Sequence, residues 1–214
     1  MFIFIFVIGI IAPFVAVLVL NQNSLRDIKK SLHPFNWINM RSYILLPVLL
    51  FGLFFLREHQ DWIRLLRFQA LIFFGYIVAL QDFRSKTIPN RYVLGFLATW
   101  VIITVPELVL RTESTLRYLS TAGLGFLAAG GFFLLLYLVS NRGLGGGDVK
   151  YIAVAGLYLG LYGILSAIFF ASILSSLTAG ILLLLKRIGR KDSIPLAPFL
   201  YVGILITIFV VRGY

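Results

Sequence analysis

Cysteine is absent from this chain of 214 residues. Its absence excludes disulfide bonds, zinc sites built from thiolates and a cysteine nucleophile. Histidine is nearly absent too, because only His33 and His59 occur, and there is neither a His-Glu-x-x-His nor a Gly-x-Ser-x-Gly motif. Zinc and serine membrane proteases are therefore poor interpretations. We interpret each histidine as a solvated loop residue, and nothing in the sequence calls for a metal ion or another cofactor.

Acidic residues are also scarce. The chain has 8 Asp and Glu against 19 Lys and Arg, which gives a formal net charge of +11. Such a charge can indicate nucleic-acid binding, but 60% of the residues are hydrophobic and the mean hydropathy is +0.99, more apolar than a soluble domain. Lipid can solvate this apolar surface. We therefore predict an all-α, polytopic transmembrane helix bundle that binds no nucleic acid, with its basic residues concentrated in cytoplasmic loops.

Eight apolar stretches are long enough, or nearly so, to cross a bilayer, which takes roughly 20 residues. They fall at residues 2–20, 42–56, 64–80, 91–110, 117–140, 149–162, 163–185 and 195–211. The second and sixth are short, so six or seven spans are alternatives to eight. The first stretch lacks a basic start and a cleavage site, and we interpret it as a retained membrane helix. Glycines in the fifth stretch would allow close helix contacts, namely Gly123, Gly125, Gly130 and Gly131.

The distribution of Lys and Arg predicts the orientation. With eight spans, the loops on one side hold thirteen of these residues and the other side holds six. The richer side is predicted to face the cytoplasm, which places both termini outside. It consists of loops 21–41, 81–91, 141–150 and 186–194. Because loop 21–41 is too short to form a domain with its own core, residues 1–214 are predicted to form a single membrane domain.

Two aspartates stand at predicted span ends on the cytoplasmic side. Asp82 follows the third apolar stretch and Asp148 precedes the sixth. As ordinary boundary residues, Asp148 would cap a helix and Asp82 would pair with a nearby basic residue. However, acids near hydrocarbon are costly, and three glycines, Gly145, Gly146 and Gly147, are a costly way to build a cap. A glycine run is better explained by a backbone that approaches something closely, such as an extended substrate.

A proline-containing turn follows Asp82. In Ile88-Pro89-Asn90, Pro89 has no N–H group and suits the first turn of the next helix, and it favours an extended backbone at Ile88. The turn is either a plain helix start or the element that fixes the path of the loop carrying the aspartate.

These residues resemble a known family. Asp82 with the turn Ile88–Asn90, and the run Gly145–Lys150 (Gly-Gly-Gly-Asp-Val-Lys), are similar to the two signatures of the type IV prepilin peptidases. Those enzymes are membrane aspartic proteases of the Gly-x-Gly-Asp type. A third match is the segment Ile194–Leu200, in which Pro195 and Pro198 resemble the proline-rich segment before the family's last span. The resemblance extends from about residue 65 to the C-terminus.

The resemblance implies a hydrolase, an aspartic endopeptidase of the cell membrane, with Asp82 and Asp148 as the catalytic pair. Its expected substrates are prepilins or pseudopilins of type IV pilus and protein secretion systems. It would remove their short basic leader at the cytoplasmic face, just before their hydrophobic helix.

The chain also departs from the family pattern. Many bacterial members carry a cytoplasmic domain between the first two spans, with paired cysteines that bind zinc, and this domain is linked to N-methylation of the trimmed substrate. Loop 21–41 stands in that place here, and no cysteine is present. We therefore predict peptidase activity without methyltransferase activity. The short form resembles the peptidases of tight-adherence pili or of archaeal pili and archaella.

A mechanism follows from the pair. Two carboxylates that share a site cannot both ionise cheaply, so one keeps a proton. Asp148, at a helix N-terminus, is predicted to be the base that activates water, and Asp82, near a helix C-terminus, the acid that binds the scissile carbonyl. The pair titrates as a unit, so these roles need not be separable. Lys150 has two interpretations, because it either steadies Asp148 or faces lipid phosphates.

Two other functional classes stay open. A transporter or channel could use Asp82 and Asp148 as a site for Mg²⁺ or Ca²⁺, although both stand at one edge of the membrane rather than near its midplane. A non-catalytic membrane scaffold would tolerate replacement of both aspartates.

Overall fold

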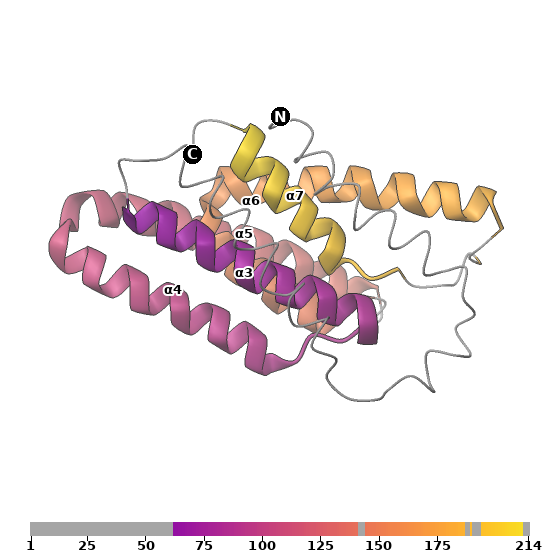
Figure 1. Ribbon diagram of the computed structural model, residues 1–214, viewed down its shortest axis with the longest axis horizontal. Helices are drawn as coiled ribbons and strands as arrows, with labels where there is room; N and C mark the ends of the chain where they lie inside the picture. The colour runs from indigo at the N-terminus through magenta and orange to yellow at the C-terminus, as the bar shows by residue number, and fades with distance from the viewer. Residues whose placement is uncertain (1–61, 141–143, 187–188, 190–193, 212–214) are drawn as a thin grey trace, which may run out of the picture. The chain divides into compact units, whose positions relative to one another are not determined.

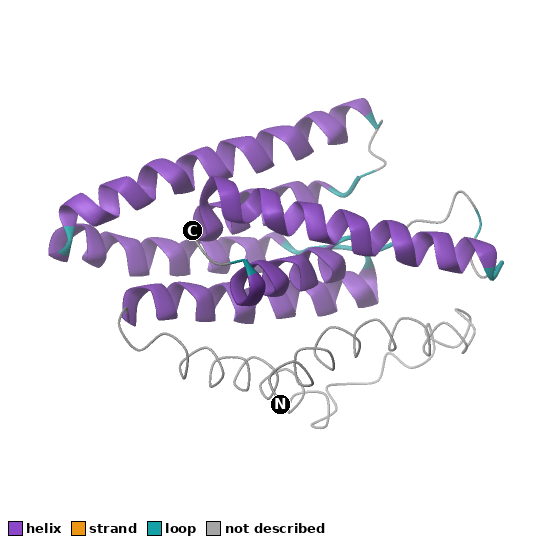
Figure 2. Cartoon of the chain, turned by 90° about the horizontal axis from the view of Figure 1, so that it is seen from above, coloured by secondary structure: helices purple, strands orange, loops and turns teal. Residues whose placement is uncertain are grey.

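The computed structural model describes residues 62–140, 144–186, 189 and 194–211. The predicted spans at 2–20 and 42–56 and the predicted loop at 21–41 lie outside these ranges. Every regular element in the described ranges is an α-helix (Figures 1 and 2). The helices are α3 (Trp62–Ser85), α4 (Asn90–Leu110), α5 (Thr112–Val139), α6 (Gly146–Leu184) and α7 (Ala197–Val210).

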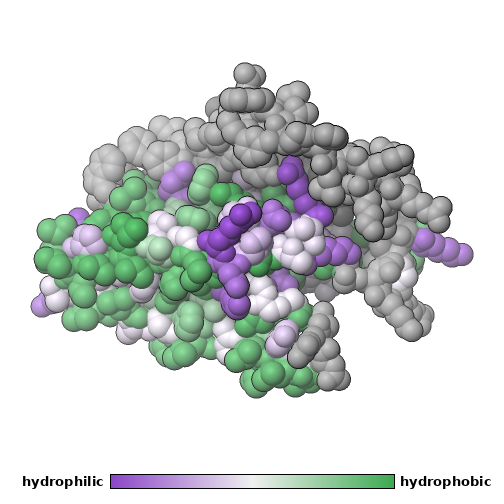
Figure 3. Space-filling model, turned by 90° about the horizontal axis from the view of Figure 1, so that it is seen from below, coloured by the Kyte–Doolittle hydropathy of each residue, from purple (hydrophilic) through white to green (hydrophobic). Residues whose placement is uncertain are grey.

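Helices α3 to α6 are long and apolar enough to cross a membrane, whereas α7 is a shorter apolar helix. Large hydrophobic side chains lie exposed along them, among them Ile102, Val109 and Leu127, each at least 67% exposed. Figure 3 shows hydrophobic side chains over much of one face. Such a surface suits lipid rather than water. The predicted all-α, multi-pass membrane protein is thus confirmed for the described ranges, while the count of eight spans and the location of the termini stay predictions.

Helix α6 is interrupted at Gly160, whose φ of 67° and ψ of −178° are not helical. Only glycine adopts such a conformation readily. Carbonyl groups near a helix end lose their helical donors. One of them, the carbonyl of Leu157, accepts hydrogen bonds from the Tyr118 hydroxyl at 2.6 Å and the Trp100 indole at 3.2 Å. Side chains of α4 and α5 thus stabilise the interruption.

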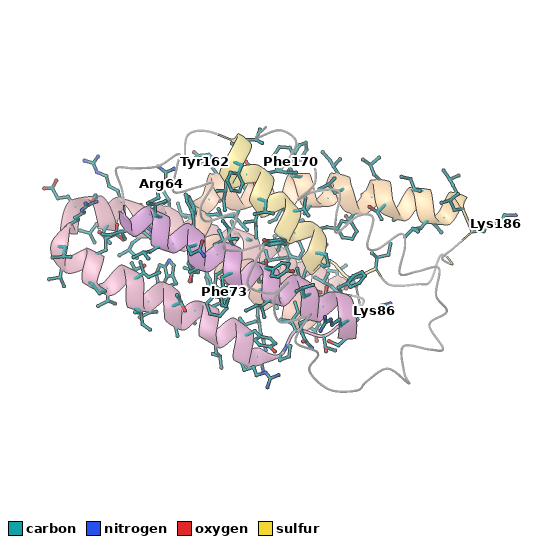
Figure 4. All side chains as sticks on the ribbon, in the orientation of Figure 1. Arg64, Phe73, Lys86, Tyr162, Phe170 and Lys186 are labelled. Carbon is teal, nitrogen blue, oxygen red and sulfur yellow. The ribbon has the colours of Figure 1, made fainter. Side chains whose placement is uncertain are left out.

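The chain turns back at Gly160. Gly147, at the start of α6, packs against Ile88 in the turn between α3 and α4. The first part of α6 therefore begins at the end of the bundle that holds this turn and runs toward the opposite end. Tyr162, just after the interruption, lies near Arg64 at the start of α3, and Lys186 lies at the opposite end, beyond Lys86 (Figure 4). The apolar stretches predicted at 149–162 and 163–185 therefore correspond to the two parts of α6.

Small residues allow the first part of α6 to pack closely on α5. A Cβ atom added at Gly125 would lie 2.6 Å from the carbonyl oxygen of Gly156, and Gly130 makes a similar close approach to α6. Gly123 and Gly131 were also predicted to allow helix contacts, but a Cβ atom at either would meet nothing within 4 Å among the described residues.

Helix α7 is buried along most of its length and packs against α3 and α6. Gly203 lies against the carbonyl group of Ala167, where no side chain would fit. This packing fixes the position of the first residue of α7, Ala197, at the end of α3.

A buried ion pair lies at the end of the bundle opposite the aspartates. No pattern in the sequence predicted it. Arg67 Nη1 of α3 is 3.1 Å from Glu107 Oε2 of α4, and the two side chains are 9% and 6% exposed. The guanidinium group also lies 3.7 Å from the ring centroid of Tyr118. These contacts join α3, α4 and α5 far from the aspartates.

Candidate active site

Asp82 lies in the last turn of α3 and is 4% exposed. Its Oδ2 accepts a hydrogen bond at 3.0 Å from the backbone N–H of Ala197, the first residue of α7. The first N–H groups of a helix lack internal partners and attract negative charge. Pro195 and Pro198 flank this contact, and Pro198 has no N–H group to leave unpaired in the first turn. The proline-rich segment Ile194–Leu200, the third predicted motif, thus contacts Asp82 directly.

The turn between α3 and α4 leads away from Asp82. Lys86 adopts a left-handed conformation with a φ of 51°, and its N–H donates to the Asp82 carbonyl at 2.7 Å. The Thr87 hydroxyl donates to Ser85 Oγ at 3.0 Å. Pro89 is the N-cap of α4, with φ −63° and ψ 137°, and so lies one position before the helical turn in which the sequence placed it. Asp82 lies inside α3 and not in the loop in which the sequence placed it. The two interpretations of the turn, a plain helix start or an element that fixes the path of the chain, both stay open.

Asp148 lies in the first turn of α6, and its backbone N–H donates to the carbonyl of Gly145 at 3.1 Å. Gly147 has no room for a side chain, because a Cβ atom there would lie 2.8 Å from the Cβ of Ile88. A Cβ atom at Gly145 would lie 2.8 Å from Asp148 Oδ2, so the carboxylate would have to move. Gly146 is less confined, with a nearest neighbour at 3.8 Å. The close backbone approach predicted from the glycine run is therefore made, in part, to the Ile88 turn.

A second contact joins the same two segments. Lys150 Nζ donates a hydrogen bond to Asn90 Oδ1 at 2.9 Å. The sequence left Lys150 either steadying Asp148 or facing lipid phosphates, whereas the structure shows it bound to the first residue of α4. All three predicted motifs thus meet at one end of the bundle.

The two carboxylates are close enough to interact electrostatically. Asp148 Oδ1 is buried and has no hydrogen-bond partner among the described residues. Neighbouring carboxylates cannot both ionise cheaply, so one of such a pair keeps a proton and the pair can supply both a base and an acid. Within the described ranges, no three His, Cys, Asp or Glu side chains form a cluster that could hold a metal ion.

Two features of the site were missed by the sequence analysis. The N–H of Ala197 is a backbone group, and no side-chain pattern reveals it before the fold is known. Tyr151 is fully buried, and the charges of both aspartates act on it. Its spacing of three residues from Asp148, which places both on one helix face, was the available signal.

Comparison with known proteins identifies relatives of this chain. The sequence profile of the type IV leader peptidase family matches residues 69–184, more than half of the chain. This range includes both aspartates and the first two motifs, whereas the third motif lies beyond it.

Two curated proteins are similar over much of the chain. The prepilin leader peptidase/N-methyltransferase of Bacillus subtilis is 30% identical over 138 residues, which cover 64% of this chain and 53% of that protein. That of Xanthomonas campestris pv. campestris is 27% identical over 139 residues, which cover 64% and 47%. The chain thus spans about half the length of these relatives. No solved structure matches the chain. Because the family profile matches more than half of its residues, the chain belongs to the type IV leader peptidase family.

Proposed function

We propose that this protein is an aspartic endopeptidase, embedded in the cell membrane, that removes the basic leader of prepilin or pseudopilin-like proteins. The observation that carries the proposal is the meeting of three segments around two carboxylates. Asp82 lies in the last turn of α3, Asp148 lies in the first turn of α6, and the N–H of Ala197 at the start of α7 binds Asp82. The family is one of peptidases, and both relatives named above are prepilin leader peptidases.

In the proposed reaction, one water molecule is added across a peptide bond. The ionised carboxylate, assigned to Asp148, takes a proton from water as the water oxygen bonds to the scissile carbonyl carbon. The protonated carboxylate, assigned to Asp82, donates a hydrogen bond to the carbonyl oxygen. The carbon–nitrogen bond then breaks, and the leaving amine takes a proton from the pair.

The glycine run offers a place for an extended substrate. Gly145 and Gly146 are exposed, and Gly145 has an extended backbone with φ −71° and ψ 132°. A backbone without side chains lets another strand come close to Asp148. We place this site at the cytoplasmic face, because the loops predicted on that side hold thirteen of the nineteen Lys and Arg residues.

The proposal does not include N-methylation, the second activity in the names of both relatives. It rests on the absence of cysteine from the chain, since the methyltransferase domains of the resembled family contain paired cysteines. The intact mass of the cleaved product tests this part, because a methyl group would raise it. A methylated product formed by this chain alone would contradict the proposal.

Leader cleavage in cells is the direct test. The chain is co-expressed with several classes of type IV prepilin, and the shift in substrate mobility is followed. Asp82→Asn and Asp148→Asn should each abolish cleavage, because asparagine keeps the size of the side chain but cannot exchange the proton. Glu113→Gln is the matched control, since Glu113 is an exposed acid in the first turn of α5, away from the motifs.

The outcomes separate the candidate functions. Cleavage lost in both aspartate variants and kept in the control would support the aspartic peptidase. Cleavage that persists in both aspartate variants would show that these residues are not the catalytic pair. No cleavage of any prepilin class by the unaltered chain would favour the scaffold or the cation transporter.

A further inference from the structure

Tyr151 lies one turn after Asp148 in α6, and 0% of its surface is exposed. Its hydroxyl has no hydrogen-bond partner in the described part of the chain, although the charges of Asp148 and Asp82 act on it. Gly75 of α3 lies close by, because a Cβ atom there would be 3.1 Å from the hydroxyl oxygen. A buried hydroxyl without a partner destabilises a fold. For packing alone, phenylalanine would be the better residue.

The acceptor that suits this donor lies on the same helix. Asp148 Oδ1 is also buried and also lacks a partner among the described residues, and residues three apart on a helix are neighbours. The phenol can donate and the carboxylate can accept. Catalytic hydrogen bonds are often long in the substrate-free enzyme and shorten in the reactive complex.

A second tyrosine is a weaker candidate for the same role. Tyr201 of α7 is buried with an unpartnered hydroxyl too, and its ring also lies close to Gly75. However, Tyr201 lies on α7, whereas Tyr151 lies one turn after Asp148 on the same helix. Tyr151 is therefore the better candidate.

We propose that Tyr151 is a positioning residue of the aspartyl pair. In the reactive complex its hydroxyl donates a hydrogen bond to Asp148 and holds the plane of that carboxylate toward the attacking water. This inference rests on the proposed peptidase function and deepens it.

Tyr158 provides a matched control on the same helix. Its hydroxyl has a partner, because it donates to the carbonyl of Phe96 at 2.8 Å. Both tyrosine rings pack on Phe96, with centroid separations of 6.2 Å for Tyr151 and 4.4 Å for Tyr158. Tyr151→Phe and Tyr158→Phe thus remove the same atom from the same aromatic cluster, and only the second removes an existing hydrogen bond.

The experiment uses the purified full chain in detergent with a synthetic prepilin peptide that contains the leader and the start of the hydrophobic helix. We measure kcat, KM and the thermal unfolding midpoint. Tyr151→Phe should lower kcat roughly 10- to 100-fold with KM little changed, because a misplaced carboxylate weakens the transition state more than substrate binding. Its unfolding midpoint should not fall. Tyr158→Phe should lower the midpoint and leave kcat close to that of the unaltered chain.

Two results would overturn the inference. A kcat for Tyr151→Phe equal to that of the unaltered chain would show that the hydroxyl does not assist the reaction. A lower unfolding midpoint for Tyr151→Phe would show that the hydroxyl has a structural partner, and this measurement needs no substrate. Failure of the peptidase function itself would look different, because the unaltered chain would then be inactive or Asp148→Asn would be active.

Discussion

At the residue scale, the two aspartates differ in what holds them. Asp82 is bound by the N–H of Ala197, whereas Asp148 Oδ1 has no partner among the described residues. The sequence assigned Asp82 the role of acid because it lies near the C-terminus of its own helix. In the structure, the N-terminus of α7 also lies next to Asp82. A helix N-terminus attracts negative charge and so favours the ionised form of this carboxylate. Helix ends alone therefore no longer separate the two roles, and the assignment of acid and base stays a prediction.

The close approach of Gly147 to Ile88 leads to a prediction about a single methyl group. Gly147→Ala would place a Cβ atom 2.8 Å from the Ile88 Cβ, and relief requires the start of α6 to move away from the turn. Overpacking of this kind costs about 1–3 kcal/mol. We expect both the thermal unfolding midpoint and the rate of leader cleavage to fall. Gly146→Ala is the control for the midpoint, because its nearest neighbour is 3.8 Å away. Equal midpoints for the two variants would contradict the close approach.

At the scale of elements, α6 connects the candidate site with the rest of the bundle. Its first part carries Asp148 in its first turn and packs on α5, and its second part packs on α7, whose first residue binds Asp82. The reversal at Gly160 allows one segment to contact both partners. We therefore expect the geometry of the aspartyl pair to depend on Gly160, which lies three turns from Asp148.

Replacement of Gly160 tests this dependence. Its φ of 67° is strained for any residue with a side chain, and such strain costs of order 1–3 kcal/mol. Gly160→Ala should lower the unfolding midpoint and, by shifting the first part of α6, also the rate of cleavage. Gly180→Ala in the second part of α6 is the matched control, because a Cβ atom at Gly180 would meet nothing within 4 Å in the described part of the chain. Alanine there should be neutral or stabilise the helix by up to about 1 kcal/mol. A Gly160→Ala variant as stable as this control would show that the reversal does not require glycine.

At the scale of the whole molecule, the sequence predicted what local pattern determines. Both aspartates, the Ile88 turn and the glycine run were identified because each motif is continuous in the chain. The Arg67–Glu107 pair joins residues 40 positions apart, and the donor to Asp82 is a backbone group 115 positions away. Such contacts are created by tertiary packing and leave no local periodicity. For the same reason, the sequence divided α6 into two apolar stretches but could not show that Gly160 turns the chain back.

The orientation of the bundle in the membrane is a prediction that the absence of cysteine makes easy to test. Ser140 follows the last residue of α5 at the end that carries the aspartates, and Ser114 lies in the first turn of α5 at the other end. Both side chains are exposed, so Ser140→Cys and Ser114→Cys each introduce one reactive thiol into a chain that has no other. Each variant should still cleave a prepilin, which confirms that it is folded.

A membrane-impermeant maleimide added to intact cells should label the Ser114→Cys variant and not the Ser140→Cys variant, because the positive-inside rule places the end with the aspartates in the cytoplasm. Permeabilised cells should give labelling of both, which shows that both thiols react. The reverse pattern in intact cells would place the aspartates outside and contradict leader removal at the cytoplasmic face. Labelling of both variants in intact cells would show that α5 does not cross the membrane. The two thiols lie at the two ends of one helix, so a difference between their labelling reports the membrane rather than the local fold.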